Sequence, residues 1–490
     1  MLFNSHLFIF IFLPLSLAGY FLLNHFGKPR FAKLFLVGMS LWFYAYFHLS
    51  YLFIILSSIL FNYMIHLLLT TGKRPRLLLF LGITGNVGIL CYYKYFDFLL
   101  ENINLLFHTS FSLLHVLMPL GISFFTFQQI GFLADTANGK VPRENFLDYA
   151  LFVVFFPQLI AGPIVSHEEM IPQFRDSSLK TFRFDHFYRG IRIFTLGLSK
   201  KVLLADTFGK AADWGFANYV SLGGFETLLV ILFYTFQLYF DFSGYCDMAR
   251  GVGSMFNIEI AVNFLSPYKS KSIIEFWDRW HITLGRFFTR YVYIPLGGNR
   301  KGAFRTYCNI LIVFLISGIW HGAGWTFVVW GCLHGVLNVL THIWRKLRSR
   351  IRFPKVRIFQ PISVVLTFVF VTLTWCFFRA STISQAVCML ENVFTMAGAG
   401  LHKQIPAAFE LSEFFYVMKF FGITRLPGAS LYCMIGFLTA AVVLIFFCKN
   451  IYETEKTYVP SVPRTLCLAF LFVWSVLSLS GVSSFLYFNF

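Results

Sequence analysis

Histidine is the side chain best suited to acid–base chemistry near neutral pH, and one histidine of this sequence stands in a strongly apolar run. His321 lies within the run 310–340, and no Lys, Arg, Asp or Glu occurs between Arg305 and Arg345. An imidazole has an ordinary pKa of about 6.5, which suits a general base. A polar group at membrane depth usually faces the protein interior and has a functional role. The alternative is a structural histidine that bonds to a neighbouring helix.

A second histidine, His281, lies in a segment, 276–284, that is rich in Trp, Asp and Arg. From 257 to 301 the chain is polar, aromatic and basic, and it contains no run long enough to cross a membrane. The apolar run with His321 follows directly. We expect the polar segment to line a cavity that is open to the cytosol, with His321 at its floor. A hydroxyl from one side would meet a thioester from the other there, which is an acyl-transfer reaction.

Small residues flank both parts of this region. Glycine and alanine at 318 and 322–324 allow a neighbouring backbone or a substrate to approach His321 closely. The pair Gly297 and Gly298 indicates a tight turn. Its N–H groups either face an oxyanion or phosphate or belong to a plain interfacial turn.

The elements that must position these histidines are membrane helices. The composition is 57% hydrophobic and 20% aromatic, and only 13% of the residues are charged. A soluble chain of 490 residues would need more charge to cover its surface. Apolar runs of about 18–25 residues recur, and the weak alternation of a membrane barrel is absent. The sequence therefore predicts an all-α, polytopic membrane protein.

We expect about eleven membrane-spanning or re-entrant helices in one domain covering 1–490. Residues 77–93 span and end in the aromatic and basic segment 92–95, which is typical of a membrane interface. Residues 97–115 are expected to lie along the membrane surface. An amphipathic helix over 187–205 ends in Lys200 and Lys201. The other predicted segments are spans at 5–24, 34–47, 51–70, 225–245, 361–378, 429–448 and 466–485, a buried helix at 118–134, a short re-entrant or surface run at 152–162, and additional C-terminal helices within 395–490.

The formal net charge of +18 does not indicate nucleic-acid binding, because the basic residues lie in short loops between apolar runs. The clusters at 28–33, 73–76 and 345–357 follow the positive-inside pattern, which places these loops in the cytoplasm and favours anionic lipid headgroups. Such loops also suit a phosphorylated cosubstrate. Nine scattered cysteines contain no C-x-x-C pair, and two histidines without carboxylate or thiolate spacing do not predict a metal site.

Six motifs in order along the chain resemble the membrane-bound O-acyltransferase family. They lie at 118–127, 156–164, 241–249, 278–281, 293–300 and 320–322. Within the family, the chain resembles the branch of the bacterial alginate O-acetyltransferase membrane subunit. The resemblance covers nearly the whole chain and is densest from 118 to 335.

This resemblance implies a ring of helices around a thin centre, with funnels from both faces that meet near a histidine. The family's essential histidine corresponds to His321, which would act as general base for an acceptor hydroxyl or would position it. His281 corresponds to the second signature histidine, and it either takes part directly or orients the cytosolic funnel. The candidates for lining the donor path are Asp241, Tyr245, Arg279 and Trp280, for which helix packing and membrane topology are the alternative roles.

The resemblance further implies a cytosolic acetyl thioester, most simply acetyl-CoA, as donor substrate, with no tightly bound cofactor. The acceptor would be a cell-surface polysaccharide beyond a bacterial cytoplasmic membrane. A separate extracytoplasmic partner, often of the SGNH-hydrolase type, would pass the acetyl group on. The expected binding partners are thus the acetyl donor, this partner protein, the polysaccharide and membrane lipids. Binding of nucleic acid is not expected.

Two other functions stay open on the sequence. One is the transfer of D-alanine or another acyl group from a carrier protein to a wall polymer or a protein. The other is a transporter of polysaccharide or lipid that uses His321 as a proton relay. The absence of an internal repeat and of acidic residues near His321 disfavours transport.

Overall fold

The computed structural model describes all residues except 352–358, 397, 399, 411–412, 414, 421, 423–427, 456, 482–484 and 487–490. The described residues form helices joined by loops, and their β-type pairing is an isolated antiparallel bridge between Phe264 and Trp280. The all-α prediction is confirmed. Parts of the predicted basic loop 345–357 and of the predicted span 466–485 lie outside the described residues.

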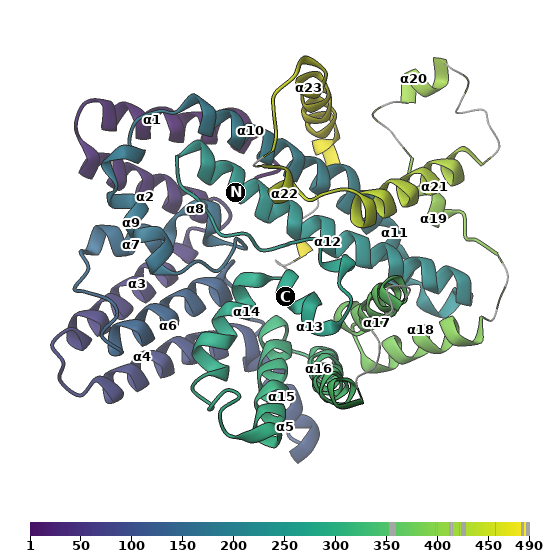
Figure 1. Cartoon of the computed structure of the whole chain (residues 1–490), viewed down its shortest axis with the longest axis horizontal. Helices are drawn as coiled ribbons and strands as arrows, with labels where there is room; N and C mark the ends of the chain where they lie inside the picture. Colours follow the sequence, from purple (N-terminus) through teal and green to yellow (C-terminus); the bar gives the residue numbers. More distant parts are fainter. Residues whose placement is uncertain are drawn as a thin grey trace.

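Apart from residues 96–107, the first third of the chain gathers on one side of the molecule, in purple and blue in Figure 1. Its helices are α1 (Leu13–His25), α2 (Pro29–Ala45), α3 (Ser50–Leu69), α4 (Pro75–Leu90), α5 (Phe96–Phe107), α6 (Ile122–Ala137), α7 (Phe146–Val154), α8 (Phe156–Leu159) and α9 (His167–Arg175). α6 is largely buried, as predicted. The run 152–162 is split between two short helices and is buried, so a surface run is wrong and a re-entrant run stays a prediction. α5 continues α4 in one apolar helical unit from Pro75 to Phe107, and the prediction that 97–115 lies along the membrane surface stays a prediction.

A long buried helix, α12 (Gly224–Met255), crosses the middle of the molecule (Figure 1). α10 (Phe184–Ser199) runs along it, and α11 (Asp206–Ala217) covers its other end. Glycines make the close crossing of α10 and α12. A Cβ at Gly197 would lie 2.7 Å from the carbonyl oxygen of Gly244, and one at Gly251 would lie 2.8 Å from that of Gly190. Small residues thus let the two backbones touch, as in other membrane helix pairs.

The histidine-bearing part follows α12. It contains α13 (Ile273–Arg279), α14 (Ile282–Phe288), α15 (Gly302–His321) and α16 (Trp325–Ile351). The apolar run 310–340 around His321 does not form one helix, because α15 ends at that residue and α16 turns back along it. A straight helix over the whole run 310–340 would measure about 46 Å, well beyond a hydrocarbon core of about 30 Å. The chain breaks at the small residues 322–324.

The C-terminal part adds further helices, in green and yellow in Figure 1, which pack on α10, α11 and α12. They are α17 (Phe359–Arg379), α18 (Ile383–Thr395), α19 (Gln404–Ala407), α20 (Phe415–Phe420), α21 (Ala429–Val442), α22 (Ile451–Glu455) and α23 (Val462–Leu477). Within the described part of the chain, 8 helices are long and apolar enough to cross a membrane. The polytopic prediction is confirmed, whereas the count of about eleven stays a prediction.

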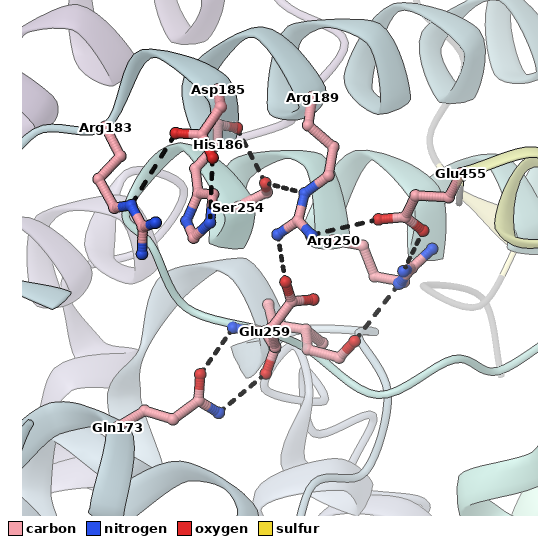
Figure 2. A network of polar contacts seen from close by, with 10 residues as sticks. Gln173, Arg183, Asp185, His186, Arg189, Arg250, Ser254, Glu259 and Glu455 are labelled. Atoms are coloured by element: carbon pink, nitrogen blue, oxygen red, sulfur yellow. Dashed lines mark hydrogen bonds and ion pairs between the residues drawn. The ribbon is translucent and has the colours of Figure 1, made fainter. Parts of the chain in front are cut away.

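A polar network fixes the start of the segment that carries His281 (Figure 2). The Arg189 guanidinium on α10 bonds to Glu259, and the main-chain N–H of Glu259 donates to Oε1 of Gln173 at 2.7 Å. Arg250 on α12 pairs with Glu455 of α22 at 2.9 Å. These contacts tie the chain just after α12 to α9, α10 and α22. The start of the segment that follows α12 and carries His281 is therefore held in a fixed position.

Candidate active site

His321 is the last residue of α15, and its side chain is buried. Its ring lies 5.2 Å, centroid to centroid, from Trp330 on α16 and 5.2 Å from Phe378 on α17. The preceding Trp320 stacks on Phe127 of α6 at 5.3 Å. Aromatic side chains from three helices thus fix the end of α15 and the direction of the imidazole.

A distant side chain caps the C-terminal end of α15. Nζ of Lys94, between α4 and α5, donates to the carbonyl oxygens of Trp320 at 2.6 Å and of His321 at 3.1 Å. The hydroxyl of Tyr95 donates to the carbonyl of Ile319 at 2.9 Å. These carbonyls have no donor within their own helix, and a cation there complements the helix dipole. The sequence predicts that residues 92–95 lie at the membrane interface. In the structure, the side chains of Lys94 and Tyr95 bond to the end of α15, the helix that carries His321.

Glycines set the close crossing of α15 and α16 beside His321. A Cβ at Gly318 would lie 2.4 Å from the carbonyl oxygen of Phe327, and a Cβ at Gly322 would overlap the Phe327 ring at 2.1 Å. A Cβ at Gly331 would lie 2.5 Å from the carbonyl oxygen of Phe314. The expectation that small residues permit a close approach near His321 is confirmed.

His281 stands at the break between α13 and α14 and has a left-handed backbone, with φ at 47°. Such a conformation costs a non-glycine residue about 1–3 kcal/mol, so its surroundings must hold it. The main-chain N–H of Ile282 donates to the carbonyl oxygen of Asn263 at 3.1 Å. The preceding Trp280 is buried and stacks on Phe276 at 5.5 Å. These neighbours keep His281 in place on both sides.

Asn263 determines the tautomer of His281. Its Oδ1 accepts the main-chain N–H of Thr283 at 3.1 Å, which identifies this atom as the amide oxygen. Nδ1 of His281 lies 3.2 Å from the same oxygen and therefore carries the proton. The lone pair of the ring is then on Nε2. Burial lowers the pKa of His281 to about 3, so the imidazole is neutral near pH 7.

The two predicted histidines lie side by side. Their ring centroids are 6.5 Å apart, and the Trp320 ring contacts both, at 6.2 Å from His281 and 4.9 Å from His321. A neutral imidazole has a lone pair that can accept a proton, and the imidazolium that forms can return it. This arrangement suits general-base chemistry on a hydroxyl.

A cavity of about 910 Å³ leads to His281 between α13, α14, α15 and α16. Its size is typical of sites for substrates and cofactors. The wall is apolar on α15 and basic toward the surface, where the Arg286 side chain is 65% exposed. The polar residues that line it are Asp278, His281, Arg286, Thr289, Arg290, Ser317, Asn338 and His342. A cavity is thus present beside the polar segment, but His321 is not among the residues that line it. The expected place of His321 at the floor of the cavity stays a prediction, and so does a second funnel from the other face.

Asp241 and Tyr245 on α12 lie away from the residues that line this cavity. The Asp241 carboxylate pairs with Nζ of Lys201 at 2.6 Å, and both side chains are 2% exposed. Tyr245 is buried and contacts the rings of Phe3 and Phe485 at 4.9 and 4.5 Å. Both residues join α12 to other segments here. Their predicted place on the donor path stays a prediction.

Arg279 and Trp280 are close to His281 in sequence but point elsewhere than into this cavity. Arg279 pairs with Glu275 at 2.7 Å, and Trp280 contributes to an aromatic cluster with Trp375 at 5.1 Å. At the turn 297–298, the N–H of Gly298 donates to the carbonyl of Tyr293 at 2.9 Å. That contact favours the plain turn. The sequence missed Lys94 and Asn263, since no short motif connects either of them to a histidine.

Among the described residues, one group has three side chains placed to share a metal ion, namely Asp135, His167 and Glu168. The guanidinium of Arg290 already pairs with Asp135 at 2.9 Å and with Glu168 at 2.8 Å. A cation in this position neutralises both carboxylates. The group therefore acts as an ion-pair cluster that joins α6 and α9 to the wall of the cavity.

The sequence matches a known protein family and several named proteins. The family model of the membrane-bound O-acyltransferases matches residues 137–382. Over the whole chain, the sequence is 41% identical to a peptidoglycan O-acetyltransferase of Helicobacter pylori, of which 98% is covered. It is 36% identical to a probable alginate O-acetylase AlgI of Pseudomonas putida, with both chains covered fully. A teichoic acid D-alanyltransferase of Streptococcus thermophilus is 29% identical over 47% of the chain and 59% of that protein.

Proposed function

The chain belongs to the membrane-bound O-acyltransferase family and is a multi-pass O-acyltransferase, and from this premise we propose that it transfers acetyl groups toward a cell-surface polysaccharide. The donor is a cytosolic acetyl thioester, acetyl-CoA. The acceptors are hydroxyl groups beyond a bacterial cytoplasmic membrane. Support for acetyl transfer comes from the names of the two relatives that match the whole chain.

The pairing of His281, which lines the cavity, with the neighbouring His321 carries this proposal. A nitrogen of the neutral His321 ring accepts the proton of the acceptor hydroxyl, whose oxygen attacks the carbonyl carbon of the thioester. The tetrahedral intermediate then collapses to the ester and a thiolate, and the thiolate takes the proton back from the imidazolium. Protons balance, and no charge remains in the aromatic surrounding.

The cavity beside the polar segment is suited to the donor. Its basic end, with Arg286 and Arg290, would meet the phosphates of acetyl-CoA, and its narrow end would bring the thioester to His281. Arg290 is already paired with Asp135 and Glu168, whereas the closest carboxylate recorded for Arg286 lies 3.6 Å away, on Glu169. Arg286 is therefore the better candidate for a phosphate contact.

The acceptor hydroxyl in this step belongs to an extracytoplasmic partner protein of the SGNH-hydrolase type, which then delivers the acetyl group to hydroxyls of the polysaccharide. The alternative donor is a D-alanyl carrier protein. It has weaker support, because the D-alanyltransferase relative matches about half of the chain. The transport alternative has no support from the family to which the chain belongs.

Purified protein in nanodiscs, supplied with acetyl-CoA labelled in the acetyl group, tests this proposal. We expect release of CoA with label transferred to an added SGNH-type partner, and a raised KM for acetyl-CoA in Arg286→Gln. Lys73→Gln, in the loop before α4, is the matched charge control. Turnover with a D-alanyl carrier protein and none with acetyl-CoA would contradict the acetyl donor.

A further inference from the structure

A groove separate from the catalytic cavity runs between α1, α10 and α23 and changes from apolar to basic along its length. Its apolar part has a volume of about 720 Å³ and is lined by side chains such as Leu17 and Leu468. Its basic part has a volume of about 850 Å³. Three residues, Ala18, Phe21 and Phe182, line both parts, so the two parts adjoin each other. No residue is shared with the cavity at His281.

The basic part contains four cations, two of which already have carboxylate partners. Lys33 pairs with Asp148 at 2.5 Å, and Arg175 pairs with Asp148 at 2.7 Å and also with Glu144. The remaining two cations, Arg30 and Lys180, line the same space. Ion pairing thus neutralises one half of the cluster and leaves an excess of positive charge in the other half.

Lys180 has a surrounding that suits an anion. Its ammonium donates to the Tyr20 hydroxyl and to the Gln173 carbonyl, each at 3.3 Å. Within the described part of the chain, no carboxylate oxygen lies within 4.0 Å of it. Burial and the nearby Lys33 lower the pKa of Lys180 to about 8. A phosphate would supply the missing negative charge and raise that pKa again.

The position of the groove fits a lipid of one particular leaflet. Its basic part lies where α1 ends and the basic loop 28–33 begins, and the positive-inside rule places such loops at the cytoplasmic leaflet. That leaflet carries anionic headgroups. Each nearby Lys or Arg increases the affinity for such a headgroup about fivefold. The apolar part then runs from this level into the region of the membrane helices.

We propose that this groove binds an anionic glycerophospholipid of the inner leaflet, with an acyl chain along the apolar part and the phosphate at Lys180 and Arg30. This binding is independent of the acetyl transfer proposed above. It would join α1, α10 and α23, three elements far apart in the sequence, through a lipid.

Native mass spectrometry of the full chain, released from micelles that contain equal amounts of phosphatidylglycerol and phosphatidylcholine, tests the proposal. We expect preferential retention of phosphatidylglycerol. Lys180→Gln should weaken its binding about fivefold, and Ala18→Trp should weaken it by filling the junction of the two parts. Both variants should keep the elution volume of the parent protein.

Lys73→Gln removes one charge from another basic loop and should leave retention unchanged. Equal retention of both lipids, or an equal loss in Lys73→Gln, would overturn the proposal. A competition experiment distinguishes a soluble phosphate from a lipid headgroup as the occupant of the groove. We expect excess glycerol 3-phosphate to leave the lipid in place, and displacement as efficient as that by phosphatidylglycerol would contradict a lipid occupant.

Discussion

The ammonium nitrogen of Lys94 lies 2.6 Å from the carbonyl oxygen of Trp320, the residue directly before His321. Lys94→Met removes this contact and the one to the His321 carbonyl at 3.1 Å. Because the end of α15 then loses its cap, we expect kcat to fall about tenfold to a hundredfold. KM for the donor should stay nearly unchanged, since Lys94 does not line the donor cavity. Steady-state kinetics in nanodiscs gives both values.

Lys94→Arg is the control for this prediction, because it keeps a cation that can donate to the same carbonyls. We expect it to recover part of kcat. A rise in KM with kcat unchanged would show that Lys94 acts on the donor and does not position His321.

Asn263 fixes the proton of His281 on Nδ1 through a contact of 3.2 Å. In Asn263→Leu the ring can take the other tautomer, and we expect the rate to fall about tenfold to a hundredfold. Thr283→Val is the matched control, since it removes the hydroxyl that donates to the same oxygen at 3.0 Å and leaves the histidine contact intact. Equal losses in the two variants would contradict the tautomer assignment.

The pH dependence of stability reports on His281. Its pKa is about 3 in the folded protein, and its ordinary value in the unfolded chain is about 6.5. Below pH 6.5 the unfolded chain binds a proton that the folded protein does not. The contribution of His281 to the free energy of unfolding is therefore fully present above pH 6.5, and it is lost as the pH falls toward 3. When the pH falls from 7 to 5, this contribution to the free energy of unfolding decreases by about 2 kcal/mol.

Thermal unfolding in detergent at the two pH values measures this effect. We expect the drop in Tm on acidification to be smaller in His281→Gln than in the parent protein. Identical drops would mean that His281 is protonated in the folded state. His66→Gln serves as a comparison for a buried histidine outside the candidate site.

The crossing of α15 and α16 has no space for a methyl group at Gly318, where a Cβ would meet a main-chain oxygen at 2.4 Å. Gly318→Ala should therefore lower the stability by about 1–3 kcal/mol and reduce turnover, because the helix that ends in His321 must shift. Gly436→Ala, on α21, has open space around the new methyl group. We expect that control to change stability by less than about 1 kcal/mol. Thermal unfolding of the two variants makes the comparison.

Composition and apolar runs were sufficient to predict the fold class and the burial of α6. Both depend on local patterns that the sequence shows directly, since few charges and long apolar runs allow few other folds. The two histidines were predicted for the same reason, as polar groups with unusual neighbours. The order of the polar segment and the apolar run assigned both histidines to one cavity, but their separation of 6.5 Å was not predicted.

The parts that the sequence did not predict depend on contacts between distant segments. Lys94 reaches its acceptor across 226 positions, and nothing local distinguishes it from an interfacial lysine. Lys201 looks like the end of an amphipathic helix but forms a buried pair with Asp241. The break after His321 was also missed, because an apolar run shows its length but not where it folds back.

The most direct test of the whole account is the His321 dependence of CoA release from acetyl-CoA, measured on purified protein in nanodiscs with the partner present. His321→Gln should reduce the rate by at least about a hundredfold. His334→Gln is the matched control, since His334 is buried in the same aromatic cluster and its Nε2 bonds to the Thr374 hydroxyl at 2.9 Å. We predict that it keeps most of the activity. Undiminished release in His321→Gln, with the protein intact, would contradict a catalytic role for His321.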